Sequence, residues 1–156
     1  MKLTAPSGVS VMLPDNVRDE LFALCEKALP DETGGIIYGS YTDHNLCASI
    51  TGITAPTSDS SAGRTWFHRG IDKLQNLLNN LWHQKLHYLG EWHFHPNGVP
   101  EPSGRDLSSL RSIAGSSKTQ CTDPIMLIVG GTKSTLTYRI FLVNADGEYV
   151  EAAPTD

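Results

Sequence analysis

Apolar residues recur at three- and four-residue spacing in three parts of the chain, which predicts three helices. The first begins near Pro14 and ends at Pro30, the second runs from Gly70 to Leu86, and a shorter third starts at Ser103. Runs rich in β-branched and aromatic residues, bounded by Gly, Pro, Asn and Asp, predict strands between them. The predicted strands cover residues 36–41, 46–55, 64–68, 88–95, 125–129 and 135–143, with another around Tyr149.

This order of helices and strands predicts an α+β fold. We expect a single domain over residues 1–156, built on a mixed, mainly antiparallel sheet flanked by helices. A chain of this length buries enough surface for one substantial core, and a second catalytic domain has no room. The polar segment 56–63, PTSDSSAG, has the composition of a loop and is the best candidate for a mobile one.

Composition and charge exclude several classes of function. The formal net charge of −5 argues against a nucleic-acid binder, because such a protein needs a concentrated positive surface. The three cysteines, Cys25, Cys47 and Cys121, are odd in number and form no C-x-x-C pair, so neither a disulfide framework nor a thiolate zinc site is expected. No apolar stretch approaches the ~20 residues that span a bilayer. We therefore expect a cytoplasmic protein that binds neither nucleic acid nor membrane.

The candidate chemistry starts with two histidines on the predicted strand 88–95. Alternate side chains on a strand share a face, so His93 and His95 point the same way with Cα atoms about 6.6 Å apart, close enough to reach one metal ion. Trp92 and Phe94 then face the core. A His-x-His pair by itself is a weak signal, since most such pairs are surface or packed residues.

Ser103 and Asp106 strengthen the case for a metal site. Their spacing is that of a capping box, in which Ser103 caps a helix and Asp106 lies in its first turn. The cap fixes Asp106 at the end of a loop that begins at His95. One carboxylate beside two imidazoles leaves a zinc ion one open position for water, which is the arrangement of a catalytic site.

These residues resemble the JAMM (JAB1/MPN/Mov34) metalloproteases. Segments 93–96, HFHP, and 103–106, SGRD, match the family motif His-x-His-Pro followed by Ser-x-x-Asp. Family members also carry a Glu upstream, near glycines at the start of a strand after the first helix, and segment 32–36, ETGGI, occupies that place. The order of elements agrees over about residues 8–145, so the resemblance implies an MPN-like domain.

The resemblance also implies a ligand set and a mechanism. His93, His95 and Asp106 would bind Zn²⁺, Glu32 would act as general base and then general acid, and Ser103 would donate a hydrogen bond to the oxyanion.

Glu91 leaves an alternative open for the base. It shares the strand face of His93 and His95, so it could be the base in place of Glu32. A carboxylate at that spacing more naturally orients a metal-bound imidazole. We therefore expect a supporting role for Glu91.

The implied substrate is a peptide or isopeptide bond after the C-terminal glycine of a ubiquitin-like protein. The chain is similar to bacterial stand-alone members that deconjugate ubiquitin-like proteins, such as those of CBASS antiphage operons that release a conjugated cGAS-like nucleotidyltransferase. Two alternatives stay open: a processing protease for a sulfur-carrier ubiquitin-like precursor, and a non-catalytic MPN-like scaffold. Segments 56–63 and 96–102 are the predicted walls for an extended substrate tail.

Overall fold

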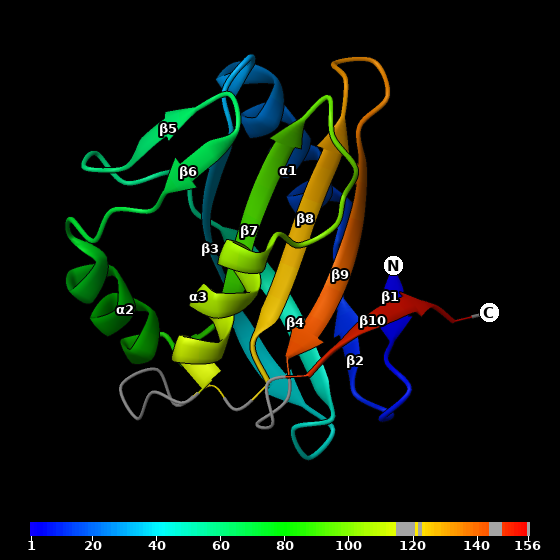
Figure 1. Cartoon of the computed structure of the whole chain (residues 1–156). Coiled ribbons are helices and arrows are strands. Elements are labelled where there is room, and N and C mark those ends of the chain that lie inside the picture. The colour runs from blue at the N-terminus through cyan, green and yellow to red at the C-terminus, as the bar shows by residue number, and fades with distance from the viewer. Residues whose placement is uncertain (115–120, 122, 144–147, 156) are drawn as a thin grey trace.

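The computed structural model describes residues 1–114, 121, 123–143 and 148–155, and within these the chain forms ten strands and three helices (Figure 1). The helices are α1 (Asp15–Ala28), α2 (Leu74–His83) and α3 (Gly104–Ala114). The strands are β1 (Lys2–Thr4), β2 (Ser10–Met12), β3 (Thr33–Thr42), β4 (Cys47–Ile53), β5 (Ser61–Gly63), β6 (Trp66–His68), β7 (His87–Pro96), β8 (Ile125–Gly131), β9 (Thr137–Val143) and β10 (Tyr149–Pro154).

Eight strands close into a barrel in the order β1-β10-β9-β8-β7-β3-β4-β2. Neighbouring strands are antiparallel except for the pairs β7 with β8 and β2 with β4, which are parallel. The strands β5 and β6 pair with each other in a separate two-stranded sheet. The α+β class and the mixed, mainly antiparallel sheet are therefore as predicted.

The closure of the sheet into a barrel corrects the prediction of a sheet flanked by helices. Strand β1 pairs with β2 on one side and with β10 on the other, which joins the two ends of the sheet. Strands β1 and β2 have three residues each, too short for alternation of apolar and polar residues to identify them in the sequence. Their buried apolar residues, Leu3 and Val11, belong to the same core as the long strands.

Helix α1 packs against the inward-facing side chains of the barrel. Its buried residues Val17, Leu21 and Cys25 lie in one cluster with Trp92 and Phe94 of β7. This cluster contains residues from all eight barrel strands and is the main core. The apolar residues of α1 that face this core recur at helical spacing, and this spacing is why the helix was predicted correctly from the sequence.

Helices α2 and α3 cover the opposite side of the same strands, and Figure 1 shows both of them on one side of β7 and β8 with α1 on the other. Leu110 of α3 packs against Met126 and Ile128 of β8. Leu74 and Leu78 of α2 pack against a small cluster that includes Ile36, Tyr88 and Cys121. The outer face of β7 therefore lies between two helices.

The second helix is shorter than its apolar pattern predicts. The carboxylate of Asp59 accepts hydrogen bonds from the backbone N–H groups of Ile71 and Asp72 at 2.9 and 3.0 Å. Lys73 has a left-handed backbone with φ of 56°, so α2 begins only at Leu74. The described part of the chain holds no helix that is both long and apolar enough to cross a membrane.

Candidate metal centre

The histidines of β7 lie on its outer face, as the alternation predicts. Trp92 and Phe94 are fully buried in the barrel core, and His93 and His95 point to the other side. His93 is 8% exposed, whereas His95 is more open to the cleft described below. The strand therefore presents two imidazoles from one rigid, paired element.

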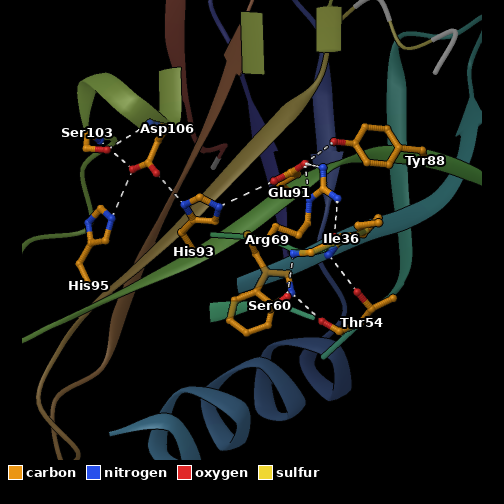
Figure 2. A network of polar contacts seen from close by, with 12 residues as sticks. Ile36, Thr54, Ser60, Arg69, Tyr88, Glu91, His93, His95, Ser103 and Asp106 are labelled. Carbon is orange, nitrogen blue, oxygen red and sulfur yellow. Dashed lines mark hydrogen bonds and ion pairs between the residues drawn. The ribbon is translucent and has the colours of Figure 1, made fainter. Parts of the chain in front are cut away.

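Asp106 meets both histidines from the first turn of α3. Its Oδ1 lies 2.6 Å from Nδ1 of His93, and its Oδ2 lies 3.3 Å from Nε2 of His95. Figure 2 shows the carboxylate between the two rings. One ligand atom from each of the three residues lies within 4.8 Å of the other two. Two imidazole nitrogens and one carboxylate oxygen at this separation fit a single zinc-type ion with an open position.

Ser103 holds Asp106 through a reciprocal capping box. The backbone N–H of Ser103 donates to Oδ2 of Asp106 at 2.8 Å, and the backbone N–H of Asp106 donates to Oγ of Ser103 at 3.1 Å. The start of α3 therefore fixes the carboxylate that faces the histidines. The Ser103 hydroxyl accepts in this pair and keeps its own proton as a hydrogen-bond donor.

A glycine on β3 makes room for the His93 ring. Gly34 pairs with His93 across the two strands, and a Cβ at Gly34 would lie 2.8 Å from both Cδ2 of His93 and Cε1 of Phe67. Phe67 of β6 contacts the His93 ring edge-on, with centroids 5.5 Å apart. The family pattern pointed to the glycines next to Glu32, and the packing supplies the physical reason for one of them.

Glu32 lies immediately before β3 and faces the same centre. Its backbone N–H donates to the carbonyl of Gly63 at 2.9 Å, which ties the end of β5 to this position. Its half-buried side chain lines a cleft together with His95 and Asp106. Burial, opposed by His95 and assisted by Asp106, raises the pKa of Glu32 above its ordinary value.

The cleft beside these residues has a volume of about 880 Å³. Part of its lining comes from Trp66 and Phe67 of β6, and another part from Gly98, Val99 and Glu101 of the loop before α3. Trp66 and Val99 are exposed apolar side chains, 42% and 64% accessible. The cleft therefore combines the polar groups of His95 and Asp106 with exposed apolar side chains from β6 and from the loop before α3.

The electrostatics of the centre favour a bound positive charge. Burial alone would raise the pKa of Asp106, but its hydrogen bonds with His93 and His95 outweigh burial and lower that pKa. Burial alone would lower the pKa of His93, but its contacts with Asp106 and Glu91 raise it. The carboxylates thus stabilise a cation at the imidazoles, and a divalent metal ion is the cation that this donor set fits best.

Glu91 is buried beneath His93 and is held by residues that sequence reasoning did not single out. It is 3% exposed, and Arg69 and Tyr88 both bind its Oε1. Its Oε2 lies 3.8 Å from Nε2 of His93. Arg69 stands 22 residues away in sequence, so no local pattern links it to Glu91.

Several known proteins are similar to this chain in sequence. Residues 14–141 match the family described as prokaryotic homologs of the JAB domain. A CD-NTase/cGAS isopeptidase of Enterobacter hormaechei is 45% identical over 122 residues, which cover 78% of this chain and 68% of the relative. A probable metalloprotease of Sinorhizobium fredii, y4qB, is 28% identical over 137 residues, which cover 82% of this chain and 80% of the relative.

A solved structure extends the likeness to the fold. The solution structure of protein DSY2949 from Desulfitobacterium hafniense has a TM-score of 0.67 and 19% identity, covering 90% of this chain and 88% of that one. The family match and the names of the relatives confirm the prediction of a JAMM-type metalloprotease of the isopeptidase class. The chain belongs to the family of prokaryotic homologs of the JAB domain.

Proposed function

We propose that this chain is a zinc-dependent isopeptidase that cleaves after the C-terminal glycine of a ubiquitin-like protein or of a protein conjugated in the same way. The observation that carries the proposal is the convergence of His93, His95 and Asp106 beside a cleft that Glu32 also lines. The relatives named CD-NTase/cGAS isopeptidase support a conjugated cGAS-like nucleotidyltransferase as the substrate.

In this proposal His93, His95 and Asp106 hold the metal. When bound, zinc would act as a Lewis acid and lower the pKa of its water ligand toward neutral pH. Glu32 takes a proton from the attacking water as oxygen bonds to the carbonyl carbon, and then gives that proton to the amine nitrogen as the C–N bond breaks. The raised pKa of the half-buried Glu32 carboxylate suits a group that both accepts and donates a proton.

Ser103 donates its hydroxyl proton to the carbonyl oxygen as that oxygen gains negative charge. The geometry supports this role because the capping box orients Oγ from the first turn of α3 while the hydroxyl proton stays free. Ser103 also lines the cleft. Cap and oxyanion donor are compatible, since they use different parts of the same hydroxyl.

The cleft suits an extended tail that ends in small residues. Gly98, Val99 and Glu101 of segment 96–102 line the cleft, as predicted. The other predicted wall, segment 56–63, is not part of the lining, and Trp66 and Phe67 of β6 take that place. Segment 56–63 instead ends in β5, where the carbonyl of Gly63 accepts a hydrogen bond from the backbone N–H of Glu32. A tail that pairs with an edge of the β5–β6 sheet would pass between Trp66 and Val99 toward His95. Glycine fits such an approach because its backbone comes close to both walls.

The test is zinc content together with cleavage of a panel of fusions. Native protein, Glu32→Gln and Asp106→Asn are compared on ubiquitin-like proteins, a sulfur-carrier precursor and a conjugated cGAS-like nucleotidyltransferase, with Glu20→Gln on the exposed face of α1 as the matched control. We expect one zinc in native protein and in Glu32→Gln, cleavage after the glycine only in native protein and the control, and loss of zinc in Asp106→Asn.

Two outcomes contradict the proposal. Native protein that binds no zinc fits a non-catalytic scaffold instead. A Glu32→Gln variant that cleaves as well as native protein shows that another residue is the general base, and Glu91 is then the carboxylate to substitute next.

A further inference from the structure

A buried carboxylate lies directly behind the metal centre. Two residues contact Oε1 of Glu91: Arg69 with Nε and Nη2, each at 2.9 Å, and Tyr88, whose hydroxyl donates at 3.2 Å. These contacts leave Oε2 toward Nε2 of His93, at 3.8 Å. Figure 2 shows Glu91 between Arg69 and Tyr88 on one side and His93 on the other.

A β-bulge places Tyr88 on the same side as Glu91. By simple alternation Tyr88 would face the barrel core together with Trp92. The register between β3 and β7 shifts after Ile37, where Gly90 pairs with Ile37 and Tyr88 with the next residue, and Gly90 has φ of 153°. Leu89 consequently faces the core and Tyr88 the outer side, where its hydroxyl reaches the carboxylate.

Burial makes the Arg69 contact necessary for a charged Glu91. A carboxylate that is 3% exposed loses most of its hydration, and only close charge and hydrogen-bond partners offset that loss. The planar guanidinium of Arg69 presents two N–H groups to one oxygen of Glu91. This contact fixes the direction of the carboxylate and stabilises its negative charge.

The imidazole of His93 is contacted at both nitrogens. Asp106 faces Nδ1 and Glu91 faces Nε2, so rotation of the ring breaks one contact or the other. Carboxylates behind a metal-binding histidine fix its tautomer and orientation, and their loss weakens metal binding. The direction of the His93 ring therefore depends on the residues that hold Glu91.

We propose that Arg69 and Tyr88 are positioning residues of the metal centre, which act by fixing Glu91 so that its second oxygen orients His93. The inference rests on the metal site of the proposed function and extends it to two residues that touch neither metal nor substrate.

Arg69 also connects this support to the segment that precedes α2. Its Nη1 donates to the carbonyl of Gly70 at 3.1 Å, and the backbone N–H of Gly70 donates to Oγ of Ser60 at 2.9 Å. Arg69 directly follows β6, whose Trp66 and Phe67 form a wall of the cleft. Arg69, which holds Glu91 behind His93, and Trp66 and Phe67, which line the cleft, thus lie on one backbone segment.

The test measures zinc affinity by chelator competition and the visible absorption of the Co²⁺-substituted protein. The variants are Arg69→Ala, Arg69→Lys, Tyr88→Phe, Glu91→Gln and the double variant Arg69→Ala with Glu91→Gln. Arg18→Ala, which removes an arginine paired with Asp15 and Asp19 on α1, is the matched control. Thermal unfolding of each metal-free protein identifies any variant that is not folded.

We expect the zinc dissociation constant to rise about tenfold to hundredfold in Arg69→Ala and in Glu91→Gln, with a smaller rise in Tyr88→Phe. Arg69→Lys recovers part of the affinity because it restores the charge without the fork. The Co²⁺ spectrum shifts in the same variants, and kcat falls more than KM changes. The double variant binds no more weakly than Glu91→Gln alone, since Arg69 acts only through Glu91.

Several results overturn the inference. If Arg69→Ala binds zinc as tightly as native protein does, Arg69 does not position the centre. Where Arg69→Ala does not fold, native zinc affinity in both Arg69→Lys and Tyr88→Phe shows that neither residue positions it. Additive losses in the double variant show that Arg69 acts independently of Glu91. Both results require native protein that binds zinc, so they differ from a failure of the proposed function, in which native protein binds none.

Discussion

Nδ1 of His93 and Oδ1 of Asp106 lie 2.6 Å apart, although His93 belongs to the barrel strand β7 and Asp106 to the helix α3. Each is fixed by its own element: His93 by the pairing of β7 with β3 and β8, and Asp106 by the capping box at the start of α3. Changes to either element should therefore alter the proposed metal centre without replacing His93 or Asp106.

Gly34→Ala should displace His93. The added Cβ would lie 2.6 Å from the carbonyl oxygen of Trp92 and 2.8 Å from the His93 ring, so we expect weaker zinc binding and a loss of about 1–3 kcal/mol in the free energy of unfolding. Gly104→Ala is the control, because a Cβ there meets nothing within 4 Å. Zinc affinity and denaturant unfolding check both; equal effects of the two substitutions contradict the prediction.

Substitutions of Ser103 should separate its cap from its chemistry. Ser103→Ala loses both the cap and the hydroxyl donor, so the free energy of unfolding should fall by about 1 kcal/mol and kcat by about 10²- to 10³-fold. Ser103→Gly caps a helix almost as well as serine but has no hydroxyl, so it should lose kcat with only a few tenths of a kcal/mol in stability. Denaturant unfolding and single-turnover cleavage measure the two effects. A Ser103→Gly variant with native kcat removes the hydroxyl from the mechanism.

Asp59 should give the start of α2 a stability that depends on pH. Hydrogen bonds from the backbone N–H groups of Ile71 and Asp72, and from the Thr57 hydroxyl, lower the pKa of Asp59 to about 2. Because the folded pKa lies below the unfolded value, this stabilisation is present above the ordinary pKa of 3.8 and is lost as pH falls toward 2.

The Asp59→Asn variant tests this dependence. Amide hydrogen exchange at Ile71 and Asp72 should be faster in the variant than in native protein near pH 5, and the difference should shrink as pH falls toward 2. A difference that stays constant over this range assigns the effect to something other than the charge of Asp59.

Metal removal should destabilise the fold as well as abolish cleavage. A ligand present at 100 times its dissociation constant stabilises the folded state by about 2.7 kcal/mol, because it binds the folded state alone. We expect the thermal midpoint of native protein to fall on treatment with a chelator and to recover with zinc. The thermal midpoint of Asp106→Asn should not depend on zinc. If the midpoints of both proteins respond equally to zinc, the metal binds at another site.

Arg139→Ala should loosen one wall of the cleft. Arg139 of β9 donates to Glu101 at 2.8 Å and is also paired with Glu151, so it ties the loop before α3 to the barrel. These pairs are exposed, and we expect a change of less than about 1 kcal/mol in stability. Steady-state cleavage should show a higher KM with nearly unchanged kcat. A fall in kcat alone contradicts a role in the wall.

The local elements of the site followed from the sequence. Strand alternation placed His93 and His95 on one face, and the spacing of Ser103 and Asp106 predicted the capping box, because both depend only on residues within a few positions of each other. The bulge next to Gly90 could not be predicted, because it depends on pairing between strands, and the backbone of Ile125, which leaves no room for a Cβ at Gly90, is far away in sequence.

Short-range spacing in the sequence is sufficient to predict the α+β class, the three helices, the long strands, and the His-x-His-Pro and Ser-x-x-Asp motif. Three other relationships depend on the folded structure: β1 closes the sheet into a barrel, Gly34 leaves space for His93, and Arg69 and Tyr88 hold Glu91. These relationships join residues far apart along the chain. Their physical reason is packing and the pairing of a buried charge, which depend on which surfaces meet after folding.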